Sequence, residues 1–358
     1  MKIDIITLNQ ERNVTLTAYI QAVGGEYRYI SRRPSILITP GGGYQYCSER
    51  ESDPVAMAYL KAGYQVFILR YSTREYAIWP NPLDDYEQAM SLIRSKAEEW
   101  CLYPDKIAVL GFSAGGHLAG CAATMSQNRP DAAILGYAVT KKESIAHCEP
   151  TAPDVVSAVD IHTCPCFVFT TRNDQLVPVE NSIEFIQALA HHGVSFESHI
   201  YAYGPHGFAT GDSSVQYRSP IICSRVPHWV ADSISWLKDI FGDFGVNCMT
   251  EPVCQKHVTG DYDDFLSVRC TFGYLSTYEP AKKVMQPFMD WLNIHREEVA
   301  HNIGQAAHLR TVKLGMAGFH SVTDDRTLRE IIENTNLPVE KIAELDCSLR
   351  EIPNHRTT

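Results

Sequence analysis

The sequence predicts an α/β fold in which helices cover both faces of a mostly parallel sheet. Short apolar runs of strand length alternate with longer helical patterns from about residue 35 to residue 241, an order typical of parallel sheets. The apolar run at 106–111 leads directly through a glycine-rich turn into a helical run. A hydrophobic content of 45% in 358 residues is ample for a large core.

The expected elements begin with an edge pair and continue as alternating strands and helices. Residues 2–8 and 14–21 alternate apolar and polar positions, which predicts two antiparallel strands at the sheet edge. Further expected strands are 35–39, 64–70, 106–111, 132–137, 166–171 and 196–203, and expected helices are 54–62, 83–100, 114–126, 179–192 and 226–241. Residues 139–163 are expected to be irregular. Functional loops gather at the carboxyl ends of parallel strands, so we expect a site at that edge.

The last third of the chain has a different pattern, and we expect two domains, at 1–243 and 244–358. Helix-like stretches lie at 278–303, 324–334 and 339–349, with one apolar run at 309–316. They predict an appended, mainly helical domain of ordinary size and unknown role. Assembly into a homo-oligomer and a lid over the site are both open as its role.

Composition and charge exclude several classes of partner. The net charge of −11 disfavours nucleic acid and anionic membranes, because phosphate binding needs a basic face. No apolar run is long enough to span a membrane, and the first residues lack the apolar core of a signal peptide. A cytoplasmic location is therefore expected. The eleven scattered cysteines indicate free thiols, and the fourteen histidines lack metal-ligand spacing, so we expect no metal and no cofactor.

A serine lies at the turn between an expected strand and an expected helix. Residues 111–115 read Gly-Phe-Ser-Ala-Gly, and a Gly-x-Ser-x-Gly turn between strand and helix is a nucleophile elbow. Glycines on both sides of the serine let strand and helix approach without clashing Cβ atoms. The pattern predicts Ser113 as nucleophile. A glycine-rich turn with a bystander serine is the plain alternative.

A base and an acid follow in the loops after two later strands. His206 lies between Gly204 and Gly207 after the last expected strand, and Asp174 follows the strand at 166–171. Asp154 and Asp160 are rival acids, but they precede that strand. We expect His206 to be the base and Asp174 the acid, in an order typical of α/β-hydrolases. The plain alternatives are a solvated loop histidine and a capping aspartate.

The donors for an oxyanion are expected from residues 40–44, Pro-Gly-Gly-Gly-Tyr, after the first buried strand. Glycines there let backbone N–H groups face a substrate oxygen. The N–H group of Ala114, which follows the nucleophile, is the expected second donor. A phosphate-binding loop is the competing interpretation, but the sequence has neither GxGxxG nor GxxxxGK[ST] here.

Other polar and aromatic residues lie near the expected site. Tyr44 and Trp79 could stack on a substrate, although core packing is an equal alternative. His117, one turn past the elbow, is expected to be a structural helix residue with local hydrogen bonds. Glu49 and Glu51 follow the oxyanion loop, and surface or capping roles are expected for them, with contact to a polar substrate as the open alternative.

With these motifs the chain resembles bacterial carboxylesterases of the α/β-hydrolase superfamily, including acetyl-xylan-esterase-like and carbohydrate acetyl esterases. The resemblance rests on ITPGGGYQYCSERESDPVA (38–56), AGYQVFILRYS (62–72), GFSAGGHLAG (111–120), NDQLVPVENS (173–182) and YGPHGF (203–208). It implies an α/β-hydrolase fold, a triad of Ser113, Asp174 and His206, and an oxyanion hole of Gly42, Gly43 and Ala114. The segment after 245 departs from the family, whose members usually end near the last helix.

The resemblance implies a serine carboxylesterase that hydrolyses small acyl esters, above all acetyl esters of carbohydrates, through an acyl-enzyme. The expected partner is a small-molecule ester, with no cofactor. Two alternatives remain open: an amidase or formamidase using the same triad, and a non-catalytic ligand-binding protein with a hydrolase fold.

Overall fold

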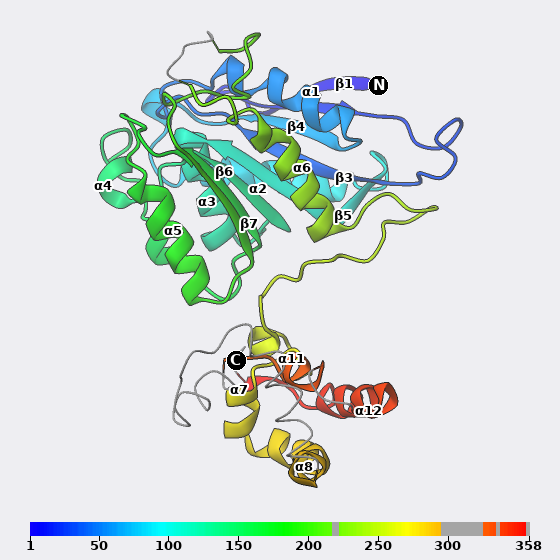
Figure 1. Cartoon of the computed structure of the whole chain (residues 1–358). Coiled ribbons are helices and arrows are strands. Elements are labelled where there is room, and N and C mark those ends of the chain that lie inside the picture. The colour runs from blue at the N-terminus through cyan, green and yellow to red at the C-terminus, as the bar shows by residue number, and fades with distance from the viewer. Residues whose placement is uncertain (217–221, 295–324, 334–336, 356–358) are drawn as a thin grey trace. The chain divides into compact units, whose positions relative to one another are not determined.

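The computed structural model describes residues 1–216, 222–294, 325–333 and 337–355. Its contacts divide the chain into two compact units, Met1–Lys256 and His257–Thr358 (Figure 1). Each unit contains buried hydrophobic clusters of its own. The division falls later than the expected boundary at 243/244, because residues 244–256 pack against the rest of the first unit. In that segment the N–H groups of Val253 and Cys254 both donate to the carbonyl of Asp239.

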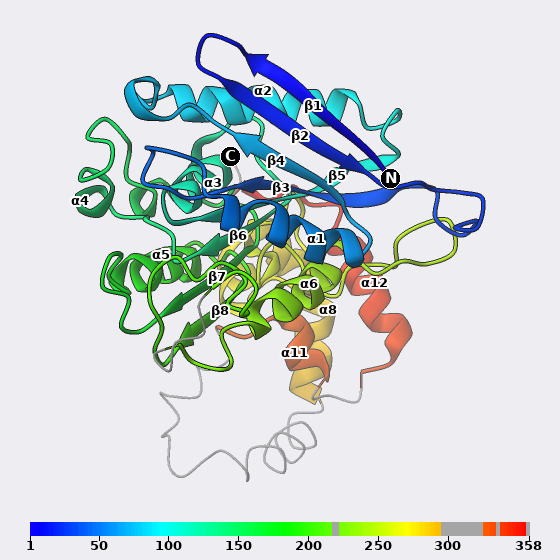
Figure 2. The same cartoon turned by 90° about the horizontal axis from the view of Figure 1, so that it is seen from above.

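Among the described residues, eight strands form one sheet in the order β1-β2-β4-β3-β5-β6-β7-β8. The strands are β1 (Lys2–Asn9), β2 (Val14–Ile20), β3 (Arg33–Thr39), β4 (Gln65–Arg70), β5 (Leu102–Phe112), β6 (Ala132–Gly136), β7 (Cys166–Thr171) and β8 (Phe196–Tyr201). β2 pairs antiparallel with β1 and with β4, and the other pairings are parallel. Figure 2 shows the blue β1 and β2 at one edge and the green β7 and β8 at the other. The expected mostly parallel sheet with an antiparallel edge pair is confirmed.

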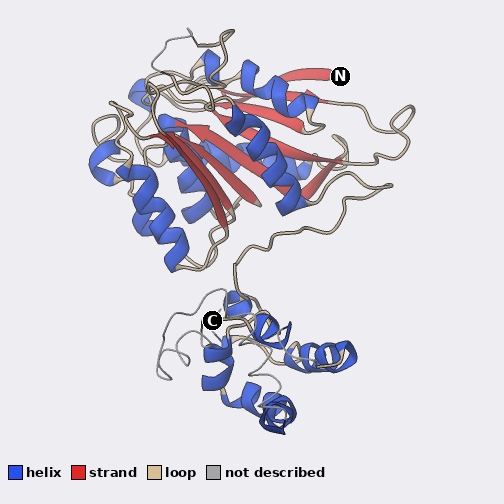
Figure 3. Cartoon of the chain, viewed as in Figure 1, coloured by secondary structure: helices blue, strands red, loops and turns tan. Residues whose placement is uncertain are grey.

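Helices cover both faces of this sheet (Figure 3). One face packs against α1 (Asp53–Lys61) and α6 (His228–Phe241), and the other against α2 (Asn81–Ser95), α3 (Ser113–Met125) and α5 (Glu180–His191). Successive side chains of a strand point to opposite faces. In β3, accordingly, Leu37 belongs to the core under α2, α3 and α5, whereas Ile36 and Ile38 belong to the core under α1 and α6.

Three local features differ from the sequence expectation. α2 ends at Ser95 rather than at residue 100, although Trp100 stays buried with its ring 5.2 Å from that of Phe67. β5 begins at Leu102 rather than at 106, because Leu102 pairs with Arg33 of β3. Residues 139–163, which the sequence predicts to be irregular, contain a short helix, α4 (Lys142–Ile145).

The second unit contains helices in its described part. They are α7 (Phe272–Thr277), α8 (Glu279–Ile294), α11 (Leu328–Glu333) and α12 (Val339–Leu349). Their apolar side chains form a core that includes Leu275, Met285, Leu328 and Leu349. The expected helix 278–303 is described only to Ile294, and the expected apolar run at 309–316 lies outside the described residues. In the described ranges of both units, no helix has the length and apolar character that crossing a bilayer requires.

Candidate active site

Ser113 lies at the junction where β5 ends and α3 begins. Its φ of 52° is in the left-handed region, which is strained for a residue with a side chain. The two flanking glycines explain how the turn is tolerated. A Cβ on Gly111 would lie 2.2 Å from the carbonyl oxygen of Gly115, and a Cβ on Gly115 would lie 2.1 Å from that of Thr39. Strand and helix therefore approach closely, as expected for a nucleophile elbow.

The structure brings the three expected side chains together at the carboxyl edge of the sheet. Nε2 of His206 lies 2.9 Å from Oγ of Ser113, and Nδ1 of His206 lies 2.7 Å from Oδ2 of Asp174. A carboxylate only accepts, so Nδ1–H donates to Asp174, and Nε2 is left to accept from the serine hydroxyl. This is the arrangement in which an imidazole can take the serine proton.

The carboxylate of Asp174 is held firmly in place. Its side chain is fully buried, and Oδ1 accepts hydrogen bonds from the N–H groups of Leu176 and Val177, each 2.9 Å long. The rival acids lie elsewhere: Asp154 accepts from the N–H groups of Lys142 and Ser157, and Asp160 pairs with Arg129. Of the three aspartates, only Asp174 is hydrogen-bonded to His206 among the described contacts.

The glycine loop after β3 lies beside the serine. Gly42 has a φ of 136° and Gly43 a φ of 61°, conformations that glycine adopts readily. A Cβ on Gly42 would also lie 2.0 Å from the carbonyl oxygen of Tyr46. Ala114 is the second residue of α3, so its N–H group is one of those that lack an acceptor within the helix. The N–H groups of Gly42, Gly43 and Ala114 therefore stay the candidate donors to an oxyanion.

A cavity of about 740 Å³ opens over these residues and is lined by Ser113, His206, Gly42 and Gly43. Tyr46 and Leu176 also line it. Neither Tyr44 nor Trp79 lines the cavity, which favours the core-packing alternative for both side chains. Tyr44 is fully buried, and Trp79 packs its ring against His117 at 5.6 Å. Tyr46, which is 59% exposed, is the aromatic side chain at the cavity instead.

His117 is hydrogen-bonded to the glycine loop through Tyr44. Its Nδ1 lies 2.8 Å from the hydroxyl of Tyr44, and its Nε2 lies 3.0 Å from the carbonyl oxygen of Pro153. Nε2–H must donate to that carbonyl, so Nδ1 accepts from Tyr44. Burial lowers the pKa of His117 to about 4, which keeps the imidazole neutral. The expected local contact is with Cys121, whose Sγ lies 3.7 Å from both ring nitrogens, and the partners Tyr44 and Pro153 are distant in sequence.

Glu51 is the residue near the site that sequence reasoning missed. It ends the short 3-10 helix Glu49–Glu51 and is only 3% exposed, whereas a surface or capping role was expected. Its Oε2 accepts from the N–H group of Gly41 at 2.7 Å, and its Oε1 accepts from the hydroxyl of Tyr137 at 2.6 Å. It lies in the family segment 38–56, but the sequence does not distinguish it from Glu49, because its burial depends on the packing of Tyr137 and the glycine loop.

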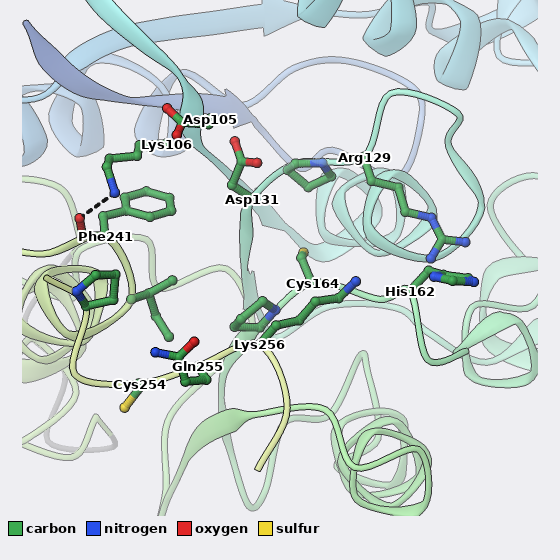
Figure 4. A pocket seen from close by; sticks show the side chains of 14 residues that line it. Asp105, Lys106, Arg129, Asp131, His162, Cys164, Phe241, Cys254, Gln255 and Lys256 are labelled. Atoms are coloured by element: carbon green, nitrogen blue, oxygen red, sulfur yellow. Dashed lines mark hydrogen bonds between the residues drawn. The ribbon is translucent and has the colours of Figure 1, made fainter. Parts of the chain in front are cut away.

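A second cavity, of about 450 Å³, lies toward the amino ends of β5 and β6, away from Ser113 (Figure 4). It is lined by charged and apolar side chains, and several of the charged ones already have partners. Lys106 donates through Nζ to the carbonyl of Phe241 at 2.8 Å, and Arg129 pairs with Asp160. Within the described part of the chain, no cluster of histidine, cysteine and acidic side chains is arranged to hold a metal ion.

Comparison with known proteins agrees with the fold. Residues 29–147 match the family model described as BD-FAE. The crystal structure of MGS-M1, an alpha/beta hydrolase enzyme from a Medee basin deep-sea metagenome library, is 40% identical, with a TM-score of 0.63. That alignment covers 67% of this chain and 98% of MGS-M1. The acetyl ester-xyloside bifunctional hydrolase from Caldicellulosiruptor lactoaceticus is 30% identical with a TM-score of 0.58, over 66% of this chain and 96% of that one.

Two curated protein sequences are also similar to this chain. The acetylxylan esterase of Xylanibacter ruminicola is 30% identical over 237 residues, 59% of this chain and 47% of the relative. The endo-1,4-beta-xylanase B of Butyrivibrio fibrisolvens is 29% identical over 211 residues, 51% of this chain and 33% of the relative. The chain thus spans between a third and about half of the length of these two relatives. The sheet, the serine turn and the solved neighbours define the class: this chain belongs to the α/β-hydrolase family.

Proposed function

We propose that the first unit is a serine esterase that hydrolyses small acyl esters, with acetyl groups on carbohydrates as the substrate class. The single observation that carries the esterase proposal is the imidazole of His206, which is hydrogen-bonded to Ser113 and to buried Asp174. The names of relatives, acetylxylan esterase and acetyl ester-xyloside hydrolase, favour the substrate class. The cavity of about 740 Å³ is large enough for a small-molecule ester.

In this mechanism His206 takes the proton of Ser113 as Oγ attacks the acyl carbon. The N–H groups of Gly42, Gly43 and Ala114 stabilise the negative oxygen of the tetrahedral intermediate. The alcohol leaves with the proton held on Nε2 of His206. Water then attacks the acyl-enzyme with His206 again as base, and Ser113 recovers its proton. Asp174 holds the tautomer of the imidazole that the reaction requires.

Replacing the nucleophile tests the proposal. Ser113→Ala should lower kcat on p-nitrophenyl acetate by up to about 10⁶, because the acyl-enzyme can no longer form. The wild type should react with a fluorophosphonate probe at Ser113, and the variant should not. Ser95→Ala, which removes an exposed hydroxyl at the end of α2, is the control and should match the wild type. Near-normal turnover by folded Ser113→Ala would exclude the serine mechanism, and faster cleavage of a formyl amide than of an acetyl ester would indicate an amidase.

A further inference from the structure

Glu51 is a buried carboxylate directly beside the reacting groups. The mechanism proposed above does not use it. Removing a carboxylate from water is unfavourable unless hydrogen bonds replace the lost hydration. Burial raises the pKa of Glu51, and the hydrogen bonds from Tyr137 and Gly41 oppose that rise. Each of its two oxygens accepts one of these bonds. A group kept buried at this position, with both oxygens satisfied, calls for a physical explanation.

The hydrogen bonds around Glu51 converge on its carboxylate and join two loops. The N–H group of Ala209 donates to the hydroxyl of Tyr137 at 3.0 Å, so the single hydroxyl proton of Tyr137 is free to donate to Glu51. Ala209 is three residues after His206, in the same loop. Gly41 immediately precedes Gly42. Glu51 and Tyr137 therefore connect the loop that carries the expected base to the loop that carries the expected oxyanion donors.

The contacts around this chain of bonds are tight. A Cβ on Gly41 would lie 2.8 Å from Oε2 of Glu51 and 3.0 Å from Cβ of Ser113, so Gly41 is wedged between the two side chains. On the other side, the ring of Tyr137 meets that of His206 edge-to-face, with centroids 5.0 Å apart. A shift of Glu51 or Tyr137 would be transmitted to the serine, the imidazole and the glycine loop. Displacements of this kind matter, since about 1 Å of misplacement can lower a rate about 10²-fold.

We propose that Glu51, acting through Tyr137, is a positioning residue that fixes the glycine loop relative to the His206 loop. The proposal rests on the esterase function proposed above. Neither side chain exchanges a proton with substrate in this role. Both hold other groups in place. Their loss should therefore lower kcat while the affinity for a small ester changes little.

The test compares Tyr137→Phe and Glu51→Gln with Tyr59→Phe in the full-length protein. Tyr59 is also fully buried, and its hydroxyl bonds to Ser233 at 2.8 Å between α1 and α6, away from the cavity. Tyr59→Phe thus measures the general effect of losing one buried phenol hydrogen bond. Tyr137→Phe removes the donor to Glu51, and Glu51→Gln keeps the shape but can accept from only one of the two donors.

We expect Tyr137→Phe and Glu51→Gln to lower kcat on p-nitrophenyl acetate by about 10- to 100-fold, with KM within about twofold of the wild type. The rate of fluorophosphonate labelling should fall in parallel. Tyr59→Phe should lower the melting temperature about as much as Tyr137→Phe while kcat stays unchanged.

Three outcomes would overturn the proposal. Wild-type kcat in folded Tyr137→Phe would show that the bond to Glu51 does not position the site. An equal loss of kcat in Tyr59→Phe would show a general packing effect. A wild-type protein that neither cleaves the ester nor reacts with the probe would contradict both the proposed function and this inference. An active wild type whose Tyr137→Phe and Glu51→Gln variants have unchanged kcat would contradict this inference alone. If Glu51→Gln does not fold, kcat of Tyr137→Phe still tests the proposal.

Discussion

Two histidines lie near the serine, and their surroundings differ. His206 has a side chain that is 15% exposed and lines the cavity, with Ser113 on one nitrogen and Asp174 on the other. His117 is fully buried, and both of its nitrogens are used by Tyr44 and Pro153. Tyr44 has a φ of 59° directly after Gly43, so its bond to His117 helps to hold a strained turn of the glycine loop.

The buried state of His117 predicts a pH dependence of stability. Burial lowers its pKa to about 4 in the folded protein, against an ordinary value of 6.5. Between these values the unfolded chain binds more protons than the folded one, so the free energy of unfolding falls as the pH falls. The contribution of His117 is fully present above pH 6.5 and is lost as the pH drops toward 4, by about 3 kcal/mol.

Urea unfolding at pH 7 and at pH 4.5 measures this effect. His117→Gln removes the titrating group but leaves the other acids and histidines in place, so the difference between the two proteins isolates His117. The stability of the wild type should fall more steeply over this interval than that of the variant. Equal losses in the two proteins would mean that His117 can be protonated without disturbing the fold.

The sequence predicts the residues of the site that motifs mark, and it misses those that tertiary packing creates. Ser113, Asp174 and His206 each follow a strand, and parallel strands bring such positions to one edge. Their convergence therefore follows from the order of the elements. Glu51 does not follow a strand, and its burial and its hydrogen bonds to Tyr137 and Gly41 arise from tertiary packing. Tyr44 and Tyr46 are two residues apart in one loop, and sequence alone does not show which of them turns inward.

At the scale of elements, the glycines at the start of α3 control how closely the helix approaches β3. A Cβ on Gly115 would lie 2.1 Å from the carbonyl oxygen of Thr39 and 2.3 Å from that of Pro40. Both are backbone atoms at the point where β3 enters the glycine loop, so they cannot move aside without shifting the loop. The sequence predicts this close approach from the spacing of the glycines. It does not give the ends of α2 and β5, which depend on the packing of Trp100 and the pairing of Arg33 with Leu102.

Gly115→Ala should therefore destabilise the protein by about 3 kcal/mol or more, as overpacking does when the neighbours are backbone atoms. Gly25→Ala is a matched control. Nothing lies within 4 Å of its Cβ, and the only penalty is a left-handed φ of 57°, which costs about 1 kcal/mol. Urea midpoints of the two variants provide the measurement, and kcat of folded Gly115→Ala should also fall because the glycine loop shifts. Equal midpoints would show that the helix can move away from β3 at little cost.

At the scale of the whole molecule, all residues proposed for the site lie in the first unit, Met1–Lys256. That unit contains both cores of the sheet, and MGS-M1 aligns with 67% of this chain over 98% of its own length. The second unit has a separate core built from α7, α8, α11 and α12. We infer that residues 1–256 contain what is needed to fold the sheet and to assemble the serine, the imidazole and the carboxylate.

Truncation tests this inference and the position of the boundary together. Residues 1–256 should retain the kcat/KM of the full chain on p-nitrophenyl acetate. Residues 1–243 should be less stable than 1–256, because they lack the segment whose backbone bonds to Tyr29, Asp239 and Ser195. At about 1 kcal/mol for each hydrogen bond, the difference should be several kcal/mol and visible as a lower urea midpoint. Loss of activity in a stable 1–256 protein would instead assign the second unit a part in catalysis.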